Sequence, residues 1–347
     1  MGKFSKKELL SIIRGVKAHK NVLIGPRPGF DSGVYDLGEG RVMVVSTDPC
    51  INVPLKYFGW FTVHFAASDL ALFGIEPSAL SVNLLGMPGS SPNLFQEIMD
   101  QISAAADELN IGIVGGHTGV YEGVSTLLAT CTVFGIGKRE QLITPGGAQP
   151  GDHILLTKHL GHEVLCNLAI SYPQWLSSHI ESDFVAYYQE SFRLQSAVTD
   201  ALTLRQFAHA LHDVTEGGLA IALNEVAEAS GVGFRLDAER LPLTPCFNAV
   251  LEALDLHNKV PNPHLGISST GMVIAAIPSH EVSAALKALS DRKIPAKDVG
   301  IFTEKLERSW YQPPSSDQAQ LFPQKVEDLY ADIFSLIKTK SASHAPL

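Results

Sequence analysis

The chain has 347 residues, of which 45% are hydrophobic and 18% charged, a composition that supports a large core and excludes an intrinsically disordered chain. Its formal net charge of −10 argues against a general nucleic-acid-binding surface or one for anionic membranes. Because single cores stop growing at roughly 250–300 residues, this length predicts two domains.

The N-terminal half mixes helix and strand signals. Runs of β-branched residues predict strands, and apolar residues at helical spacing predict helices. Helices are predicted over 5–19, 57–74 and 92–109, strands over 41–47, 78–85, 111–114 and 125–136, and a Gly/Pro-rich loop over 22–33. The first long strand is expected to end at Asp48-Pro49.

The segment 144–152, TPGGAQPGD, is dense in glycine and proline and precedes a new strand, so it predicts the domain boundary. We expect an N-terminal domain over 1–146, a C-terminal domain over 147–340 and a disordered tail over 341–347. Since strands and helices follow no strict βαβα order, the fold class is α+β. The second half is predicted to contain strands near 153–158, 232–236, 271–277, 297–302 and 307–311, and helices near 161–170, 176–189, 192–211, 217–229, 280–290 and 326–338.

The four cysteines are widely spaced and form no CxxC pair. This spacing predicts buried, reduced thiols rather than a zinc site or a disulfide framework. The basic amphipathic N-terminus lacks the apolar run and cleavage site of a signal peptide, and no window reaches the ~20 apolar residues of a membrane span. These features favour a soluble, cytoplasmic protein with neither nucleic acid nor membrane as a partner.

Three aspartates of the N-terminal half suggest a metal site. Asp31 lies in the turn GFDSGV, Asp48 directly follows a strand, and Asp69 lies within the apolar stretch FTVHFAASDLALF. Several carboxylates gathered together suit Mg²⁺, which prefers hard oxygen ligands and bridges to phosphate oxygens. Taken alone, Asp31 could equally stabilise a turn and Asp48 could end a strand. Asp69 favours function more strongly, because a charge in so apolar a helix should be paired or liganded.

Two glycine pairs stand beside polar residues, in Gly115-Gly116-His117-Thr118 and in Asp213-Val214-Thr215-Glu216-Gly217-Gly218. Paired glycines expose backbone N–H groups, and the start of a helix directs the positive end of its dipole at an anion. The structural alternatives are an ordinary loop histidine at His117, an N-cap at Thr215 and a helix-dipole partner at Asp213. Together the clusters predict an acidic, metal-mediated nucleotide site, since neither GxxxxGK[ST] nor an opening GxGxxG occurs.

In this order the motifs resemble the superfamily that contains aminoimidazole ribonucleotide (AIR) synthetase, formylglycinamidine ribonucleotide synthetase, selenophosphate synthetase, thiamine-monophosphate kinase and a hydrogenase-maturation protein. Thr47-Asp48, the stretch from Ser68-Asp69 to Pro77, and Gly115-Gly116-His117-Thr118 are similar to its N-terminal motifs. Asp213-Val214-Thr215-Glu216-Gly217-Gly218-Leu219-Ala220 is similar to the second-domain signature of the hydrogenase-maturation and formylglycinamidine branches.

The resemblance implies an AIR synthetase-like fold of two domains. An N-terminal mixed sheet with helices would pair with a second copy into a dimeric barrel, and the C-terminal domain would be an α/β sandwich. ATP would lie in a cleft there, with Mg²⁺ on its phosphates. The implied chemistry is phosphoryl transfer from ATP to an amide, thio-acid or similar oxygen on an unknown small-molecule or protein-bound substrate.

The resemblance also implies roles for individual residues. Catalytic roles are implied for Asp48 and Asp69, magnesium ligation for Asp31, Asp48, Asp69 and Asp213, and nucleotide contacts for Asp31, Gly115, Gly116, His117, Thr118, Asp213, Thr215, Gly217 and Gly218.

The chain departs from the family pattern at several points. Ser32 stands where many members have a second adjacent aspartate. His117 stands where the maturation and kinase branches carry aspartate, and a histidine at this position is more like selenophosphate synthetase. No reactive cysteine loop near the N-terminus supports selenophosphate synthesis. The segment SASHAPL has no cysteine, whereas the hydrogenase-maturation protein carries its thiocarbamate on a C-terminal cysteine.

Three hypotheses follow from this pattern. The first is an ATP-dependent enzyme nearest to the maturation branch. The second is a non-catalytic nucleotide-binding accessory factor, because the acidic set is thinned at Ser32 and His117. The third is a maturation factor whose acceptor cysteine lies on a partner protein.

Overall fold

The computed structural model describes residues 4–304, 310–312 and 319–342. The chain divides into an N-terminal unit, residues 4–144 with 196–205, and a C-terminal unit that holds 145–195 and the described residues from 206 onward. The division after Thr144 falls inside the glycine- and proline-rich segment. Residues 196–205, which the sequence analysis assigned to the second domain, pack with the N-terminal unit.

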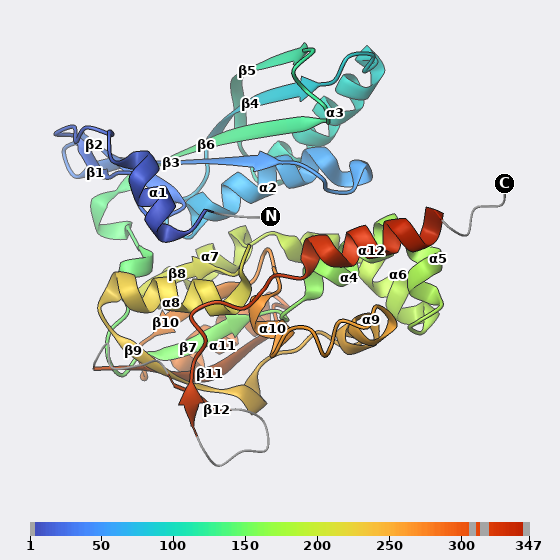
Figure 1. Cartoon of the computed structure of the whole chain (residues 1–347). Coiled ribbons are helices and arrows are strands. Elements are labelled where there is room, and N and C mark those ends of the chain that lie inside the picture. The colour runs from blue at the N-terminus through green and yellow to red at the C-terminus, as the bar shows by residue number, and fades with distance from the viewer. Residues whose placement is uncertain (1–3, 305–309, 313–318, 343–347) are drawn as a thin grey trace. The chain divides into compact units, whose positions relative to one another are not determined.

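The N-terminal unit is built on a six-stranded mixed sheet in the order β1-β2-β3-β6-β4-β5 (Figure 1). All neighbouring strands are antiparallel except β4 and β5, which are parallel. Its elements are α1 (Lys6–Ile13), β1 (Val22–Ile24), β2 (Ser32–Gly38), β3 (Arg41–Cys50), η1 (Leu55–Tyr57), α2 (Phe58–Ala71), β4 (Ala79–Gly86), α3 (Pro92–Glu108), β5 (Gly112–Val120), β6 (Leu128–Lys138), η2 (Arg139–Gln141) and α7 (Val198–Leu204).

Helix α2 is buried on nearly every side, and it packs on β3 and β6 of the sheet and on α3. The close approach of the two helices depends on Gly59, whose N–H donates to Gln101 Oε1 at 2.8 Å. A Cβ at this position would lie 2.6 Å from the carbonyl oxygen of Ile98. Helix α7 packs on α2 as well, which explains why it belongs to this unit.

Two expectations for the N-terminal strands are wrong. Residues 22–33 are not one loop, since they contain β1 and the first residues of β2. Strand β3 does not end at Asp48 but runs through Pro49 to Cys50, paired along its whole length with β6. Strand β2 pairs with β3 only as far as Ser46, so Pro49 lies beyond the part of β3 that β2 covers, where a proline is tolerated.

The Gly-Gly-His-Thr motif lies within a strand and not in a turn, which corrects a further expectation. Strand β5 continues through it to Val120 and forms an exposed edge of the sheet. Gly116 is required there, because a Cβ would collide with the carbonyl oxygen of Val82 on β4. The strand predicted over 111–114 was too short, because glycine has a low intrinsic preference for strands. In the structure, pairing with β4 overrides that low preference.

The C-terminal unit contains a seven-stranded sheet in the order β13-β12-β9-β11-β7-β10-β8. Its strands are antiparallel except for the parallel pair β9 and β12. Its elements are η3 (Pro145–Gly147), β7 (His153–Thr157), α4 (His162–Ser171), α5 (Pro173–Ser177), α6 (Ser182–Glu190), η4 (Phe192–Gln195), β8 (Ala210–Asp213), α8 (Gly218–Ser230), β9 (Gly233–Asp237), η5 (Ala238–Arg240), α9 (Phe247–Ala253), α10 (Pro263–Gly266), β10 (Val273–Ile277), α11 (Val282–Asp291), β11 (Ala296–Thr303), β12 (Trp310–Gln312), β13 (Gln320–Leu321) and α12 (Tyr330–Ala342).

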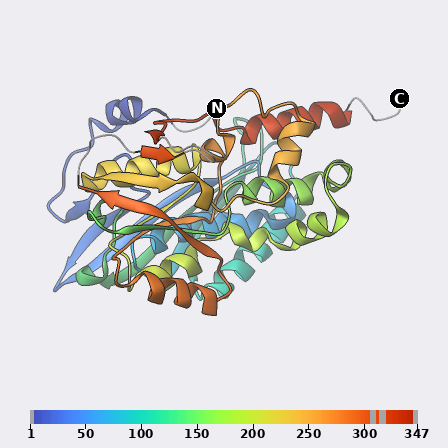
Figure 2. The same ribbon diagram turned by 90° about the horizontal axis from the view of Figure 1, so that it is seen from below.

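Helices cover both faces of this sheet, so β10 is buried along its whole length, and Figure 2 shows α8 and α11 on opposite sides of the strands. The two-domain α+β class is therefore confirmed. The predicted helix over 192–211 is wrong: the segment holds η4, α7 and then strand β8. Pairing of β8 with β10 overrides its local helical preference.

The remaining differences concern ends and short helices. The predicted helix over 176–189 is two helices, and α9 and α10 were not predicted. Of the predicted tail, Ser341 and Ala342 belong to α12, and residues 343–347 lie outside the described residues. Among the described helices, none combines the length and apolar character needed to cross a membrane.

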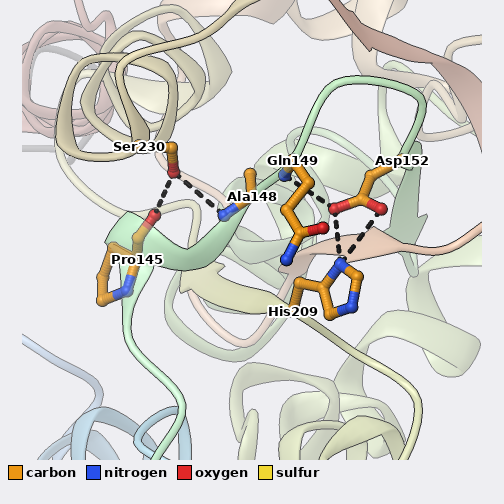
Figure 3. A network of polar contacts seen from close by, with 6 residues as sticks. All are labelled: Pro145, Ala148, Gln149, Asp152, His209 and Ser230. Atoms are coloured by element: carbon orange, nitrogen blue, oxygen red, sulfur yellow. Dashed lines mark hydrogen bonds and ion pairs between the residues drawn. The ribbon is translucent and has the colours of Figure 1, made fainter.

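The segment that begins the C-terminal unit is fixed by polar contacts (Figure 3). Ser230 on α8 donates to the carbonyl oxygen of Pro145 at 3.1 Å and accepts from the N–H of Ala148 at 3.0 Å. Asp152 lies 3.0 Å from His209 Nδ1. The glycine- and proline-rich segment is therefore a structured start of this unit, although its composition is typical of a loop.

Candidate functional site

The hydroxyl of Ser46 joins two of the predicted aspartates in the N-terminal unit. Ser46 lies on β3, and its Oγ is 3.1 Å from Asp69 Oδ2 on α2 and 3.4 Å from the carbonyl oxygen of Asp31. Ser32, opposite Ser46 in the β2–β3 register, donates to the carbonyl oxygen of Asp69 at 3.0 Å. One serine hydroxyl thus contacts the backbone of Asp31 and the carboxylate of Asp69, from segments that are distant in the sequence.

Asp48 lies two residues beyond Ser46 on β3. Alternate residues of a strand share one face, so Asp48 lies on the same face as Ser46, at the end of the strand where β2 no longer covers its edge. Its carboxylate helps to raise the pKa of Cys50 and of Cys131, after burial, which is the larger cause. Asp48 is half-buried, as Asp31 and Asp69 are.

Sequence reasoning missed Ser46, the residue that organises this group. The available signal was a polar residue at a core-facing position in the otherwise apolar strand VMVVST, since Ser46 is 1% exposed. Two other polar residues of α2 were also missed. Ser68 Oγ accepts from the N–H of Ala197, and His64 Nδ1 lies 2.8 Å from Ser196 Oγ. Both fix the segment that precedes α7.

The residues of the Gly-Gly-His-Thr motif are exposed on β5. The His117 ring stacks on Tyr121 with 6.0 Å between ring centroids, and its Nε2 lies 2.6 Å from the Tyr121 hydroxyl. This contact holds the imidazole along the strand. The nucleotide contacts assigned to Gly115, Gly116, His117 and Thr118 remain a prediction.

Asp213 in the C-terminal unit ends β8 and is buried. The preceding residue, His212, places Nδ1 3.1 Å from Asp213 Oδ1 and 2.9 Å from its carbonyl oxygen. On the other side of the ring, Nε2 lies 3.2 Å from Glu225 Oε2 on α8. The sequence analysis gave roles to neither His212, which directly precedes the motif, nor Glu225, which follows it on α8.

The start of α8 is formed by glycines. Gly217, the N-cap residue, and Gly218 have φ angles of 86° and 62°, which side chains other than glycine rarely adopt. The N-cap residue is Gly217 and not Thr215, whose carbonyl oxygen accepts from the N–H of Gly218. The N–H of Gly217 donates to Asp328 Oδ2 at 3.4 Å, so a carboxylate of the chain already faces this helix start.

The N-terminal group fits a magnesium ion by the chemistry of its donors. Asp31, Asp48 and Asp69 offer carboxylate oxygens, the ligand type that Mg²⁺ prefers, and all three are half-buried. Ser46 fixes one oxygen of Asp69, as hydrogen bonds to ligating carboxylates do in metal sites. Magnesium ligation by Asp31, Asp48 and Asp69 remains a prediction.

Cys50 is not suited to act as a nucleophile, although it follows Asp48 closely. Burial raises the pKa of Cys50, Cys131 and Cys166 to about 12, so at pH 8 only about one thiol in 10⁴ is ionised. Cys246 is half-buried. We expect a thiol-specific reagent to modify at most one cysteine of the native protein readily and all four after denaturation.

Substitution of Cys246 by serine should remove that reaction, and Cys50→Ser should leave it unchanged. Rapid labelling of Cys50 in the native protein, identified by mass spectrometry of peptides, would contradict the burial of this thiol.

Comparison with known proteins places the chain in a family. The model of the AIR synthase related protein N-terminal domain matches residues 29–137, and that of the C-terminal domain matches residues 149–310. Carbamoyl dehydratase HypE of Cupriavidus necator is 30% identical over 270 residues, which cover 76% of this chain and 73% of that protein.

The chain belongs to the AIR synthase-related family. A selenide, water dikinase of Geobacter metallireducens is also similar, at 30% identity over 70% of this chain and 69% of its own length. Among solved structures, hydrogenase maturation protein HypE in complex with ATP has a TM-score of 0.67 at 21% identity and covers 92% of this chain and 95% of its own. A thiamine-monophosphate kinase of Stenotrophomonas maltophilia has a TM-score of 0.64 at 22% identity, with coverage of 91% and 98%. These structures share the fold of this chain.

Proposed function

We propose that this AIR synthase-related protein is an enzyme that uses magnesium and ATP to phosphorylate and dehydrate a carbamoyl-type group. The observation that carries the proposal is the Ser46 hydroxyl, which contacts the Asp69 carboxylate and the backbone carbonyl of Asp31. Ser46 lies two residues before Asp48 on β3. The similarity to carbamoyl dehydratase HypE supports the choice of substrate class. The ATP bound by the solved HypE relative supports the choice of nucleotide.

Carbamoyl dehydration needs an activated oxygen, because hydroxide is a poor leaving group. The γ-phosphoryl group of ATP would move to the carbamoyl oxygen, breaking its bond to the β–γ bridging oxygen and releasing ADP. The nitrogen would lose one proton as its carbamoyl oxygen is phosphorylated, and its second proton as the C–O bond breaks, so that phosphate leaves and a nitrile forms. The net change is removal of one water from the carbamoyl group, coupled to ATP cleavage.

The residues of the N-terminal unit would position the phosphates for this transfer. Asp31, Asp48 and Asp69 would hold Mg²⁺, which when bound neutralises the charge on the phosphate oxygens. Ser46 would keep the Asp69 carboxylate in one rotamer. From the family pattern, Asp213 and the Thr215-to-Gly218 turn would serve the same nucleotide, and the exposed backbone at Gly115 and Gly116 would contact it.

We also propose that the protein is a homodimer through β5. Among the described strands, β5 is the last in the sheet order. Ile113, Val114 and Val120 on it, and Tyr121 directly after it, are exposed large apolar or aromatic residues. An unpaired, apolar edge favours pairing with another strand. A second copy of β5 would cover it, in keeping with the dimeric barrel expected from the sequence.

The second candidate is a nucleotide-binding accessory factor without turnover. Its support is that Ser32, which replaces an aspartate of the family pattern, is buried and donates to the backbone of Asp69 rather than adding a carboxylate. The two candidates differ in turnover and not in binding.

The test is ADP formation by the purified chain with ATP, Mg²⁺ and a panel of carbamoyl and thiocarbamoyl compounds. We expect turnover that requires Mg²⁺ and rises with one class of carbamoyl compound, together with nitrile formation detected by mass spectrometry. Tight binding of ATP with no ADP formed across the panel would favour the accessory factor.

A further inference from the structure

Asp213, the predicted metal ligand of the C-terminal unit, lies at one end of a chain of polar contacts that no motif assignment explains. His212 is 3% exposed, and its ring lies between two carboxylates. Nδ1 is 3.1 Å from Asp213 Oδ1, and Nε2 is 3.2 Å from Glu225 Oε2. Both ring nitrogens therefore lie beside carboxylates, and the Nε2–Glu225 contact is an ion pair when the ring carries a proton on each nitrogen.

The secondary structure makes this orientation rigid. His212 pairs with Ile274 in the β8–β10 register, so its backbone is fixed by the sheet. Glu225 lies on α8, whose start at Gly217 and Gly218 immediately follows the motif. The contacts therefore connect the end of the strand to the helix and hold the Asp213 side chain between them.

The contacts of His212 Nδ1 indicate that the Asp213 side chain is the group that is fixed. Nδ1 faces the carbonyl oxygen of Asp213 as well as its carboxylate, and both are acceptors, so Nδ1 carries a proton and donates to them. Because this single N–H contacts both the carbonyl oxygen and the carboxylate of Asp213, it restricts the rotamer of the Asp213 side chain. Partners that stand behind a ligating carboxylate typically set metal affinity, and their loss costs about 10- to 100-fold.

We propose that His212, held by Glu225, is a positioning residue that presents the Asp213 carboxylate to the magnesium ion of the bound nucleotide. This inference rests on the proposed function, which makes Asp213 a metal ligand. Neither His212 nor Glu225 needs to touch the nucleotide or the metal for this role.

The experiment is calorimetric titration of the full chain with a non-hydrolysable ATP analogue, once with Mg²⁺ and once in EDTA. We expect His212→Ala and Glu225→Ala to raise the Kd of the magnesium complex about tenfold and to leave the Kd in EDTA unchanged. His212→Asn, whose amide keeps a donor near the place of Nδ1, should recover part of the loss.

Matched controls lie in the same unit. His209→Ala removes a comparable histidine–aspartate pair, with Asp152 (Figure 3), and Glu228→Ala removes an exposed glutamate of α8. Both should bind the magnesium complex as the unchanged protein does. Circular dichroism identifies variants that fail to fold, and if His212→Ala is one of them, His212→Asn and Glu225→Ala decide.

Asp213→Asn distinguishes metal ligation by Asp213 from the positioning role of His212 and Glu225. If it weakens the magnesium complex but His212→Ala and Glu225→Ala bind as the unchanged protein, the positioning role is wrong and the proposed function stands. Equal weakening with and without Mg²⁺ would also overturn the positioning role. If Asp213→Asn has no effect while turnover persists, Asp213 is not a ligand and the inference fails with that assignment.

Discussion

Replacement of Asp69 by asparagine should lower magnesium-dependent ATP turnover by about 100-fold or more, the order expected for removing one group that stabilises charge in the transition state. Asparagine has nearly the shape of aspartate, and its amide oxygen can still accept from Ser46 Oγ, so the fold should persist. What is lost is the negative charge that would hold Mg²⁺ on the phosphates. The measurement is ADP release at saturating ATP over a range of Mg²⁺ concentrations.

The matched control is Asp107→Asn, which neutralises an exposed aspartate on α3 of the same unit. It should leave both turnover and the Mg²⁺ dependence unchanged. Unchanged turnover in Asp69→Asn, with thermal unfolding like that of the parent, would remove Asp69 from the catalytic group and with it the central support for the proposed function.

Gly59→Ala should be among the most destabilising single substitutions in the N-terminal unit, with a loss of about 2 kcal/mol in the free energy of unfolding. The added Cβ would lie 2.5 Å from Gln101 Cβ, 2.6 Å from the carbonyl oxygen of Ile98 and 2.7 Å from the N–H nitrogen of Ile102. Two of these atoms are backbone, so α2 and α3 must move apart. Because Asp69 lies on α2, ATP turnover should fall as well. Urea unfolding measures the loss.

Gly123→Ala provides the comparison, because a Cβ at Gly123 meets no atom within 4 Å. Its unfolding curve should match that of the parent protein within about 0.5 kcal/mol. If Gly59→Ala were as stable as Gly123→Ala, the close packing of α2 on α3 would be wrong.

The sequence predicted the fold where local pattern and tertiary context agree. The apolar stretch around Asp69 and the periodic pattern of α3 indicated two helices in nearly the right places. The segment that became β8 has helical preference, and only its pairing with β10 makes it a strand. The glycines of β5 gave a similar error, since their strand depends on β4 as a neighbour. Pairing between strands that are distant in the sequence cannot be predicted from local sequence patterns.

For the candidate site, the sequence identified carboxylates but not their supports. Asp31, Asp48 and Asp69 were recognised from acidic residues at strand ends and in an apolar helix. Ser46 and His212 were not, because a serine in a strand and a histidine before an aspartate have many ordinary roles. Their importance depends on which side chains meet across elements, and this follows from register and packing rather than from spacing.

The assignment of residues 196–205 to the N-terminal unit means that neither half is one continuous length of polypeptide. A fragment cut after Thr144 would lack α7 and would leave Ser68 on α2 without Ala197, whose N–H it accepts. The complementary fragment would carry α7 without the helix that it covers. To express the two units separately, residues 196–205 must therefore be joined to the N-terminal unit, and a linker must connect residue 195 to residue 206 in the C-terminal unit.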